Sequence, residues 1–357
     1  MNISTNYLND FPKQNKPSGA YEWWYFDAMS ICGNWGVVII FYQGNPFSPH
    51  YIQAMEKNES SADEFPALSI SVYHHDKAEY YAFLDFRKDD FSWSEDSKTL
   101  QIGNNSFSIS QNDEELAYHI ELDQPLESGH SLKASLNFES KVCSKNVLKT
   151  SFNDDDSHQW DLSQPIATVE GSMLISAKTG VQEMEFDGIG YHDHNVGLRP
   201  MKDDFKSWYW GRCHFKNHIL IYYAMNGHVD TQYEGWLLDR KTLKLVQKYD
   251  EFTFKKYKRS LFGLTFASTI TLFGPTSKIY INQNTLIDNG PFYQRFNSSF
   301  LLKHNGKAFR AQGFTEYIVP SRIYLKRFWP AVNMRLRNLK AKPHWVQKIK
   351  ALYEWTW

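Results

Sequence analysis

Short segments in which apolar and polar residues alternate recur through most of this 357-residue chain, and long helical periodicity is scarce before residue 320. An alternation with a period of two is typical of β-strands that bury one face. Gly, Asn and Asp cluster between these segments at the spacing of turns in antiparallel meanders. One continuous apolar run, GVVIIFYQG at residues 36–44, predicts a fully buried strand. The pattern therefore predicts an all-β protein built from barrels or sandwiches.

Two stretches of the chain resemble each other and suggest how many such units there are. The aromatic run WWYF at residues 23–26 leads through a turn into VVIIFYQGN, and WYW at residues 208–210 leads through a turn into ILIYYAMNG. The offset of about 185 residues predicts two similar β-domains with a junction near residues 197–207. We place the first domain at residues 1–197 and the second at residues 198–321.

The remaining segment, residues 322–357, differs from both domains. Its basic residues run from Arg322 to Lys350 without an acidic residue until Glu354, and aromatic and aliphatic residues lie between them. This mixture predicts a basic C-terminal tail of one or two short amphipathic helices, interrupted at Pro330 and Pro343. The tail either rests on an anionic membrane surface or packs on a barrel with its basic face in solvent.

Charge and cysteine content limit the classes of function. The 39 Lys and Arg residues nearly balance the 40 Asp and Glu residues, so no global charge attracts a nucleic acid. Cys32, Cys143 and Cys213 are odd in number and lack a C-x-x-C spacing, which argues against a disulfide framework or a structural zinc site. No apolar run has the length of a signal peptide core or of a spanning helix. We therefore expect a cytoplasmic protein, with contact at the inner membrane face through the tail as an addition.

One segment concentrates polar residues that carry chemistry, GIGYHDHNVG at residues 188–197. On a regular strand His192 and His194 share one face, while Tyr191, Asp193 and Asn195 share the other. The two imidazoles could supply two ligands to zinc, with a third ligand such as His214 or His218 from elsewhere.

The opposite face supports a different hypothesis. Asp193 among aromatic residues would have a raised pKa, which keeps a carboxyl group protonated and able to act as an acid. Alternatively, Asp193, His194 and Asn195 only tie down a turn by local hydrogen bonds. Phosphate-binding and serine-hydrolase motifs are absent from the sequence, and no helical context supports a dinucleotide fold.

Two further groups of charged residues need an interpretation. Glu22 lies in a strongly aromatic strand and is expected to be buried, so it needs a partner. Arg212 and Arg322 are candidate partners for Glu22 or for Glu316. The acidic run at residues 154–156 predicts an exposed turn rather than a calcium loop.

Four blocks of sequence, taken together, resemble a known family. They are GAYEWWYFDA (residues 19–28), GIGYHDHNVG (188–197), WYWGR (208–212) and EYIVPSR (316–322). In this order they resemble the lipocalin-like family that includes the carotenoid 1,2-hydratases (hydroxyneurosporene synthases) and the AttH-like proteins. The resemblance implies two lipocalin-like antiparallel β-barrel domains. Val196 stands where the family pattern has an aromatic residue, and the basic tail lies outside the pattern.

The resemblance also implies an activity and a set of residues. Hydratase members add water, without a cofactor, to the terminal double bond of an acyclic carotenoid, so neither a cofactor nor a metal is expected, and the partner is a hydrophobic isoprenoid or polyene. Asp193 would protonate a trisubstituted alkene, and His192 or His194 would orient Asp193 or deprotonate the water. Tyr191 would help to stabilise the carbocation.

The other expected substrate-binding residues are Trp24, Glu22, Trp208, Trp210, Arg212 and Asn195. Two alternatives to the hydratase stay open. A terpenoid or polyene cyclase would use the same proton donor, because fungal cyclases look like distant relatives. A non-catalytic carrier would bind the hydrophobic ligand with its aromatic residues alone.

Overall fold

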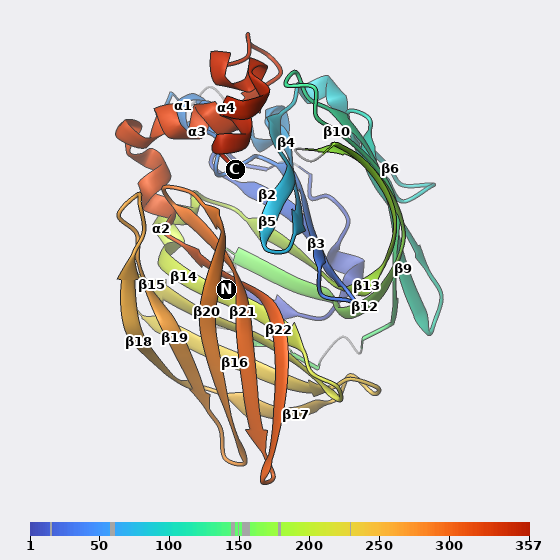
Figure 1. Cartoon of the computed structure of the whole chain (residues 1–357), viewed down its shortest axis with the longest axis vertical. Helices are drawn as coiled ribbons and strands as arrows, with labels where there is room; N and C mark the ends of the chain where they lie inside the picture. Colours follow the sequence, from blue (N-terminus) through green and yellow to red (C-terminus); the bar gives the residue numbers. More distant parts are fainter. Residues whose placement is uncertain are drawn as a thin grey trace. The chain divides into compact units, whose positions relative to one another are not determined.

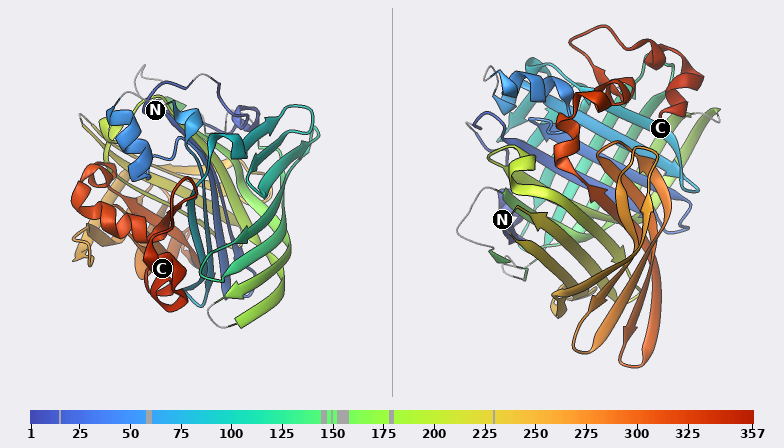
Figure 2. Two further views of the ribbon diagram at one scale, coloured as in Figure 1. Left: turned by 90° about the horizontal axis from the view of Figure 1, so that it is seen from above. Right: turned by 90° about the vertical axis from the view of Figure 1, so that its left-hand side faces the viewer.

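A computed structural model of the chain describes residues 1–14, 16–57, 61–143, 147–148, 150–151, 158–177, 180–228 and 230–357 (Figure 1). The chain forms two compact units, Met1–Pro200 with Trp329–Trp357 and Met201–Phe328. Each unit contains one sheet that curls on itself, as the views in Figure 2 show. The predicted all-β, lipocalin-like class is confirmed, and its two sheets are curled half-barrels. The acidic run at residues 154–156 lies outside the described residues.

The first unit holds a 14-stranded sheet. Its strands are β1 (Asn2–Ser4), β2 (Tyr21–Ser30), β3 (Trp35–Gln43), β4 (Pro66–His74), β5 (Lys77–Asp85), β6 (Phe91–Ser94), β7 (Thr99–Ile102), β8 (Asn105–Gln111), β9 (Glu115–Pro125), β10 (Ser131–Lys141), β11 (Thr150–Ser151), β12 (His158–Ala177), β13 (Gly180–Gly197) and β23 (Leu336–Asn338). They follow the order β23-β5-β4-β3-β2-β13-β12-β10-β9-β8-β7-β6, with β1 pairing β11 and β12 off this path. Helices α1 (Pro49–Glu56), α3 (Trp329–Arg335) and α4 (Lys350–Trp355) also belong to this unit, with 3-10 turns at Tyr7–Asn9, Ala62–Glu64, Lys88–Asp90 and Trp345–Lys348.

The second unit holds a nine-stranded sheet. Its strands are β14 (Phe205–His214), β15 (His218–Gly227), β16 (Thr231–Asp239), β17 (Leu245–Tyr249), β18 (Glu251–Arg259), β19 (Thr265–Phe273), β20 (Ser277–Asn289), β21 (Tyr293–His304) and β22 (Lys307–Ile318). They follow the order β17-β16-β15-β14-β22-β21-β20-β19-β18. Helix α2 (Met201–Asp204) precedes the sheet, and 3-10 turns at Pro320–Tyr324 and Lys326–Phe328 follow it.

The two sheets share one connectivity. In each, an early strand pairs both with the next strand and with a strand from the end of the meander: β2 with β3 and β13, β14 with β15 and β22. The two hairpins are the stretches whose sequences resemble each other, so the internal similarity reflects a repeated sheet. The boundaries between the two units lie after Pro200 and after Phe328. The division at residues 197 and 321 into separate domains and a tail stays a prediction.

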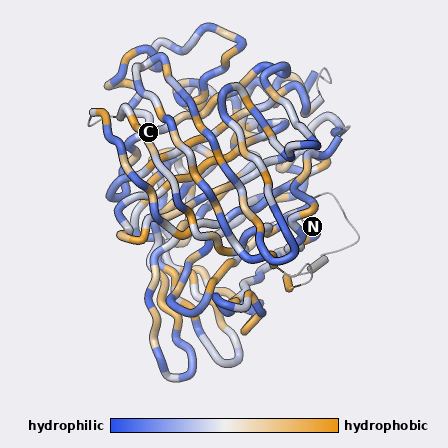
Figure 3. The backbone as a smooth tube through the Cα atoms, turned by 90° about the vertical axis from the view of Figure 1, so that its right-hand side faces the viewer, coloured by the Kyte–Doolittle hydropathy of each residue, from blue (hydrophilic) through white to orange (hydrophobic). Residues whose placement is uncertain are grey.

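Alternating burial along the strands explains why these segments form curled sheets. Along β9, buried residues alternate with more exposed ones over the whole strand, and the tube in Figure 3 alternates in the same way between hydrophobic and hydrophilic residues along its long strands. The inward side chains of the first sheet, among them Phe26, Ile39 and Phe107, form one apolar core. Those of the second sheet, among them Tyr222 and Ile270, form another. Each sheet thus buries one face on itself.

The segment after residue 321 differs in detail from the predicted tail of one or two short helices. Pro330 does not interrupt a helix, because it is the second residue of α3 and its missing N–H belongs to the first turn, where no intrahelical partner exists. Strand β23 was missed by the sequence analysis, and it pairs in parallel with Phe83–Asp85 of β5. In the described part of the chain, no helix combines the length and the apolar character needed to cross a membrane.

Candidate active site on strand β13

Strand β13 carries two different sets of side chains on its two faces. In its pairing with β2, His192 lies opposite Phe26 and His194 opposite Trp24, while Asp193 lies opposite Tyr25. Trp24 and Phe26 belong to the core of the first unit. The imidazoles therefore point into this core, and Asp193 points away from it, as the alternation predicted.

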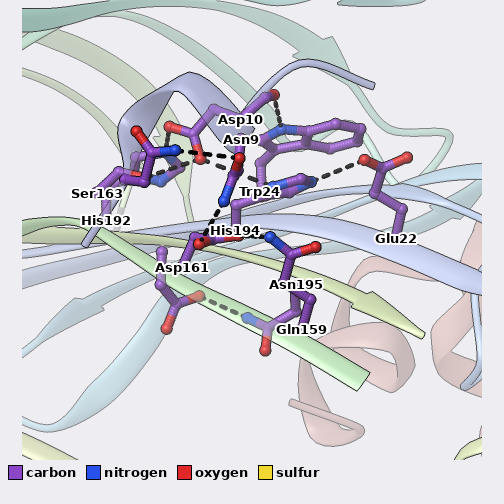
Figure 4. Close-up of polar contacts among 12 residues, drawn as sticks. Asn9, Asp10, Glu22, Trp24, Gln159, Asp161, Ser163, His192, His194 and Asn195 are labelled. Carbon is purple, nitrogen blue, oxygen red and sulfur yellow. Dashed lines mark hydrogen bonds and ion pairs between the residues drawn. The ribbon is translucent and has the colours of Figure 1, made fainter. Parts of the chain in front are cut away.

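The imidazoles meet a buried carboxylate that the sequence analysis did not identify. Asp10 accepts hydrogen bonds from the hydroxyls of Tyr118 and Ser163, the latter at 2.8 Å, and its Oδ2 lies 3.2 Å from His192 Nε2 (Figure 4). Its Oδ1 lies 3.7 Å from His194 Nδ1. Asp10 thus joins both histidines of the motif to the walls of the barrel.

Glu22 forms the second half of this cluster. Its carboxylate lies 2.8 Å from His194 Nε2 and 2.8 Å from Lys16 Nζ, and it accepts two hydrogen bonds of 3.1 Å from the backbone N–H of Lys13. Glu22 is buried, as predicted, but the prediction of an arginine partner is wrong because Lys16 supplies the cation.

The two candidate arginines have other surroundings. Arg322 donates to the backbone carbonyls of Phe262 and Gly263. Glu316 pairs with Arg295, whose Nε lies 3.0 Å away, and accepts from the hydroxyl of Tyr293.

The buried charges of this cluster stabilise one another. Burial acts to raise the pKa of Asp10, but the charge and hydrogen bond of His192 and the charge of His194 outweigh it, so the pKa lies below its usual value. Burial acts to lower the pKa of His194, but the hydrogen bond and charge of Glu22 outweigh it and raise the pKa. The ring of His192 stacks on Phe26 at 3.9 Å, and that of His194 stacks on Trp24 at 4.9 Å. Together these contacts form a buried ion network that holds strand β13 in place.

Asp193 has a different set of partners on the other face. Its Oδ2 accepts from the indole N–H of Trp160 at 2.8 Å and from the hydroxyl of Tyr191 at 2.7 Å. Its Oδ1 lies 2.9 Å from Asn195 Nδ2. The side chain is buried, and the ring of Tyr25 meets the ring of Tyr191 edge-on at 6.2 Å. Asp193 is thus a carboxyl group held at both oxygens in an aromatic environment.

These contacts can serve both protonation states of Asp193. Trp160 is only a donor, so together with Tyr191 it keeps Oδ2 in the role of acceptor. A proton on Asp193 Oδ1, beside Asn195, leaves both of these hydrogen bonds in place. An amide group can present either its NH₂ or its carbonyl oxygen to a neighbour, so Asn195 can donate to the carboxylate or accept from the acid.

A neutral histidine borders the same group. Burial lowers the pKa of His158 to about 3, while a hydrogen bond with Asn195 acts in the opposite direction. Its Nδ1 lies 2.9 Å from the hydroxyl of Tyr21. His158 is therefore uncharged at neutral pH and adds no positive charge beside Asp193.

The structure brings together only part of the predicted set. Tyr191, Asp193 and Asn195 form one group, whereas Glu22 and Trp24 lie with the two imidazoles on the opposite face of the strand pair. The expected contact between an imidazole and Asp193 is replaced, among the described residues, by the bonds of the imidazoles to Asp10, Glu22 and the Tyr25 carbonyl.

The remaining predicted residues lie on β14 of the second unit. Tyr209 and Cys213 of this strand belong to the core of that unit, so Trp208, Trp210 and Arg212 lie on its other face. All three are buried. Arg212 Nη1 lies 3.1 Å from His214 Nδ1.

Several residues of both groups were not predicted from the sequence. Asp10, Lys16, His158 and Trp160 stand in segments with no motif that would single them out. Trp160 is placed by its pairing opposite Asn195 in the β12–β13 ladder, which a single sequence does not reveal.

The metal hypothesis for the two histidines finds no support in this geometry. Both nitrogens of His192 already face oxygens, those of the Tyr25 carbonyl and of Asp10. Within the described ranges, no group of three or more His, Cys, Asp or Glu side chains is arranged to hold a metal ion.

Comparison with known sequences gives a family and several relatives. The family model described as carotenoid hydratase CrtC matches residues 38–323. A hydroxyneurosporene dehydrogenase of Chlorobaculum tepidum is 27% identical in an alignment 338 residues long that covers 90% of this chain and 88% of that protein. Acyclic carotenoid 1,2-hydratases of Thiocapsa roseopersicina and Rubrivivax gelatinosus are each 25% identical, over 60% and 56% of this chain and 49% and 46% of their own lengths.

Solved structures share the fold at low sequence identity. An AttH protein of Nitrosomonas europaea aligns with a TM-score of 0.58 and 12% identity, over 87% of this chain and 95% of its own. CghA in complex with Sch210972 aligns with a TM-score of 0.56 and 10% identity, over 85% and 89% of the two chains. These likenesses concern the arrangement of the strands.

Proposed function

This chain belongs to the carotenoid hydratase family CrtC, and from this premise we propose that it adds water to a C=C bond of an acyclic carotenoid or a related polyene. It is an enzyme of the hydro-lyase type. The observation that supports Asp193 as its acid is the frame of Tyr191, Trp160 and Asn195 around one buried carboxyl group.

The first step of the proposed reaction is a proton transfer. Asp193 Oδ1–H gives its proton to one carbon of a trisubstituted alkene, the π electrons form the new C–H bond, and the neighbouring carbon becomes a tertiary cation. The carboxylate left behind is stabilised at Oδ2 by the donors on Tyr191 and Trp160. Its negative charge and the ring faces of Tyr191 and Tyr25 stabilise the cation.

The second step is the capture of water. The oxygen of a water molecule bonds to the cationic carbon, and the resulting oxonium returns one proton to Asp193 Oδ1. The alkene has then gained H and OH, and Asp193 is again an acid, so the cycle consumes no cofactor. The buried cluster around Asp10 and Glu22 holds β13, and with it Asp193, in position. Trp208, Trp210 and Arg212 are proposed as further substrate-binding residues.

The direct test is product analysis in heavy-oxygen water. The purified protein, without added cofactor or metal, is incubated with acyclic carotenoids and shorter isoprenoids in detergent, and the products are identified by mass spectrometry. A product heavier than the substrate by one labelled water is expected. In a parallel incubation with an added two-electron acceptor, loss of two hydrogens would favour the activity in the name of the Chlorobaculum tepidum relative. Without the acceptor, an isomer of unchanged mass would favour a cyclase, and unchanged substrate retained on the protein would favour a carrier.

Replacement of Tyr191 by phenylalanine tests the frame around Asp193. Loss of one charge-assisted hydrogen bond to the departing carboxylate, worth about 1.5–3 kcal/mol, should lower kcat by about 10- to 100-fold. KM should change little, because the ring remains. Tyr257→Phe, at an exposed tyrosine of β18, is the matched control and should leave kcat unchanged. An unchanged kcat in Tyr191→Phe would contradict the assigned role of the hydroxyl.

A further inference from the structure

Four large apolar side chains near the C-terminus face solvent. Trp345, Ile349, Leu352 and Trp355 are 62%, 47%, 37% and 77% exposed, and we call them the C-terminal patch. Leu352 and Trp355, three residues apart, share one side of helix α4, Trp345 begins the turn Trp345–Lys348, and Ile349 joins the two with extended backbone. Val346, Gln347 and Tyr353 of the same stretch are buried. Helix α4 lies at the red end of the chain in Figure 1.

The segment that carries the patch is fixed to the first unit. Gln347 Nε2 donates to the backbone carbonyls of Asn333 and Leu336 at 3.1 and 3.0 Å. Glu354 Oε1 lies 2.9 Å from Nε2 of the buried His130. The apolar side chains are therefore displayed on an anchored scaffold, which distinguishes them from the loose end of a chain.

The exposed charged residues of the stretch that carries the C-terminal patch are lysines. Lys342, Lys348 and Lys350 are exposed in the same stretch. Glu354 is the single acidic residue between Arg322 and the end of the chain, and it is engaged with His130. Two exposed tryptophans and three exposed lysines thus lie within residues 342–355.

We propose that the C-terminal patch docks on an anionic lipid surface. Tryptophan favours the boundary between headgroups and acyl chains because its ring is apolar and its N–H needs a polar partner. Lysines on the edge of an amphipathic helix reach anionic headgroups, and each contributes to binding in a way that salt weakens. The proposal stands apart from the proposed reaction, although it would bring the protein to the phase in which a polyene dissolves.

The test is co-sedimentation of the full chain with vesicles of phosphatidylglycerol and phosphatidylcholine, compared with vesicles of phosphatidylcholine alone. Binding to the anionic vesicles is expected, with a blue shift of tryptophan emission and a loss of affinity at high salt. The double variant Trp345→Ser/Trp355→Ser should bind at least about tenfold more weakly. Lys342→Gln/Lys348→Gln should bind about 30-fold more weakly, from roughly 1 kcal/mol for each charge.

Two matched variants distinguish binding through the C-terminal patch from nonspecific adsorption to the vesicles. Tyr257→Ser/Leu261→Ser removes apolar side chains that are 62% and 86% exposed in the second unit, and Lys241→Gln/Lys244→Gln removes exposed charges there. Both should bind as the wild type does. The proposal is overturned if the wild type stays in the supernatant, or if the two patch variants bind as well as it does. Light scattering that shows a dimer, dissociated by the tryptophan substitutions, would assign the surface to a second copy instead.

Discussion

Asp193→Asn is expected to lower the rate of hydration by at least about 10³-fold, within the range that a positioned general acid contributes. The alkene is a very weak base, so no other group on this face replaces the lost proton. The fold should survive, because the oxygen of the new amide can still accept from Tyr191 and Trp160, and its NH₂ can donate to the carbonyl of a turned Asn195. The measurement is kcat with an acyclic carotenoid, beside Tm and substrate affinity.

Asp187→Asn is the control on the same strand, at an exposed position, and should retain full activity. Quenching of tryptophan fluorescence by the polyene should give similar affinities for the wild type and both variants. An Asp193→Asn protein that turns over substrate at the wild-type rate would remove Asp193 from the proposed role. One that also fails to bind substrate would assign Asp193 to binding instead of proton transfer.

The repeated sheet was predictable because its signal is local. Alternation along strands such as β9, and the similarity of the hairpins β2–β3 and β14–β15, are properties of short segments. The short strand β23 was not predictable in this way, because its three residues pair with Phe83–Asp85, more than 200 residues earlier in the chain. Parallel pairing at that separation depends on tertiary contacts that no local pattern encodes.

Strand alternation was enough to predict which residues of the candidate site share a face, but not which residues they contact. The split of His192 and His194 from Asp193 follows from a period of two, and the structure bears it out. The partners of each set do not follow, since Asp10 and Lys16 come from the N-terminal segment and Trp160 comes from β12. The expected link from imidazole to Asp193 does not form, because β13 continues as a paired strand through Gly188, Gly190 and Gly197 and keeps the two sets on opposite faces.

The second large effect is expected for the free energy of unfolding. Glu22→Gln keeps the size of the side chain but removes the charge that faces Lys16 and His194, and both of these are buried. Breaking a buried ion pair by removing one partner typically costs about 3–5 kcal/mol, because the remaining charge is left uncompensated. Urea unfolding at pH 6 should show a loss near this size. Glu127→Gln, which removes the partly exposed partner of Arg337, is the control and should cost less than about 1 kcal/mol.

The pH dependence identifies the contribution of His194. Its pKa in the folded protein is raised above the ordinary value of 6.5, chiefly by Glu22 acting against burial, so the stabilisation is complete below that ordinary value and is lost as pH rises through the folded pKa. The difference in unfolding free energy between wild type and Glu22→Gln should therefore be largest near pH 6 and shrink toward higher pH. It should not vanish, because the pair of Glu22 with Lys16 persists. A difference that stays constant from pH 6 to pH 9 would mean that His194 does not carry the charge assigned to it, and that Lys16 alone accounts for the stability of the cluster.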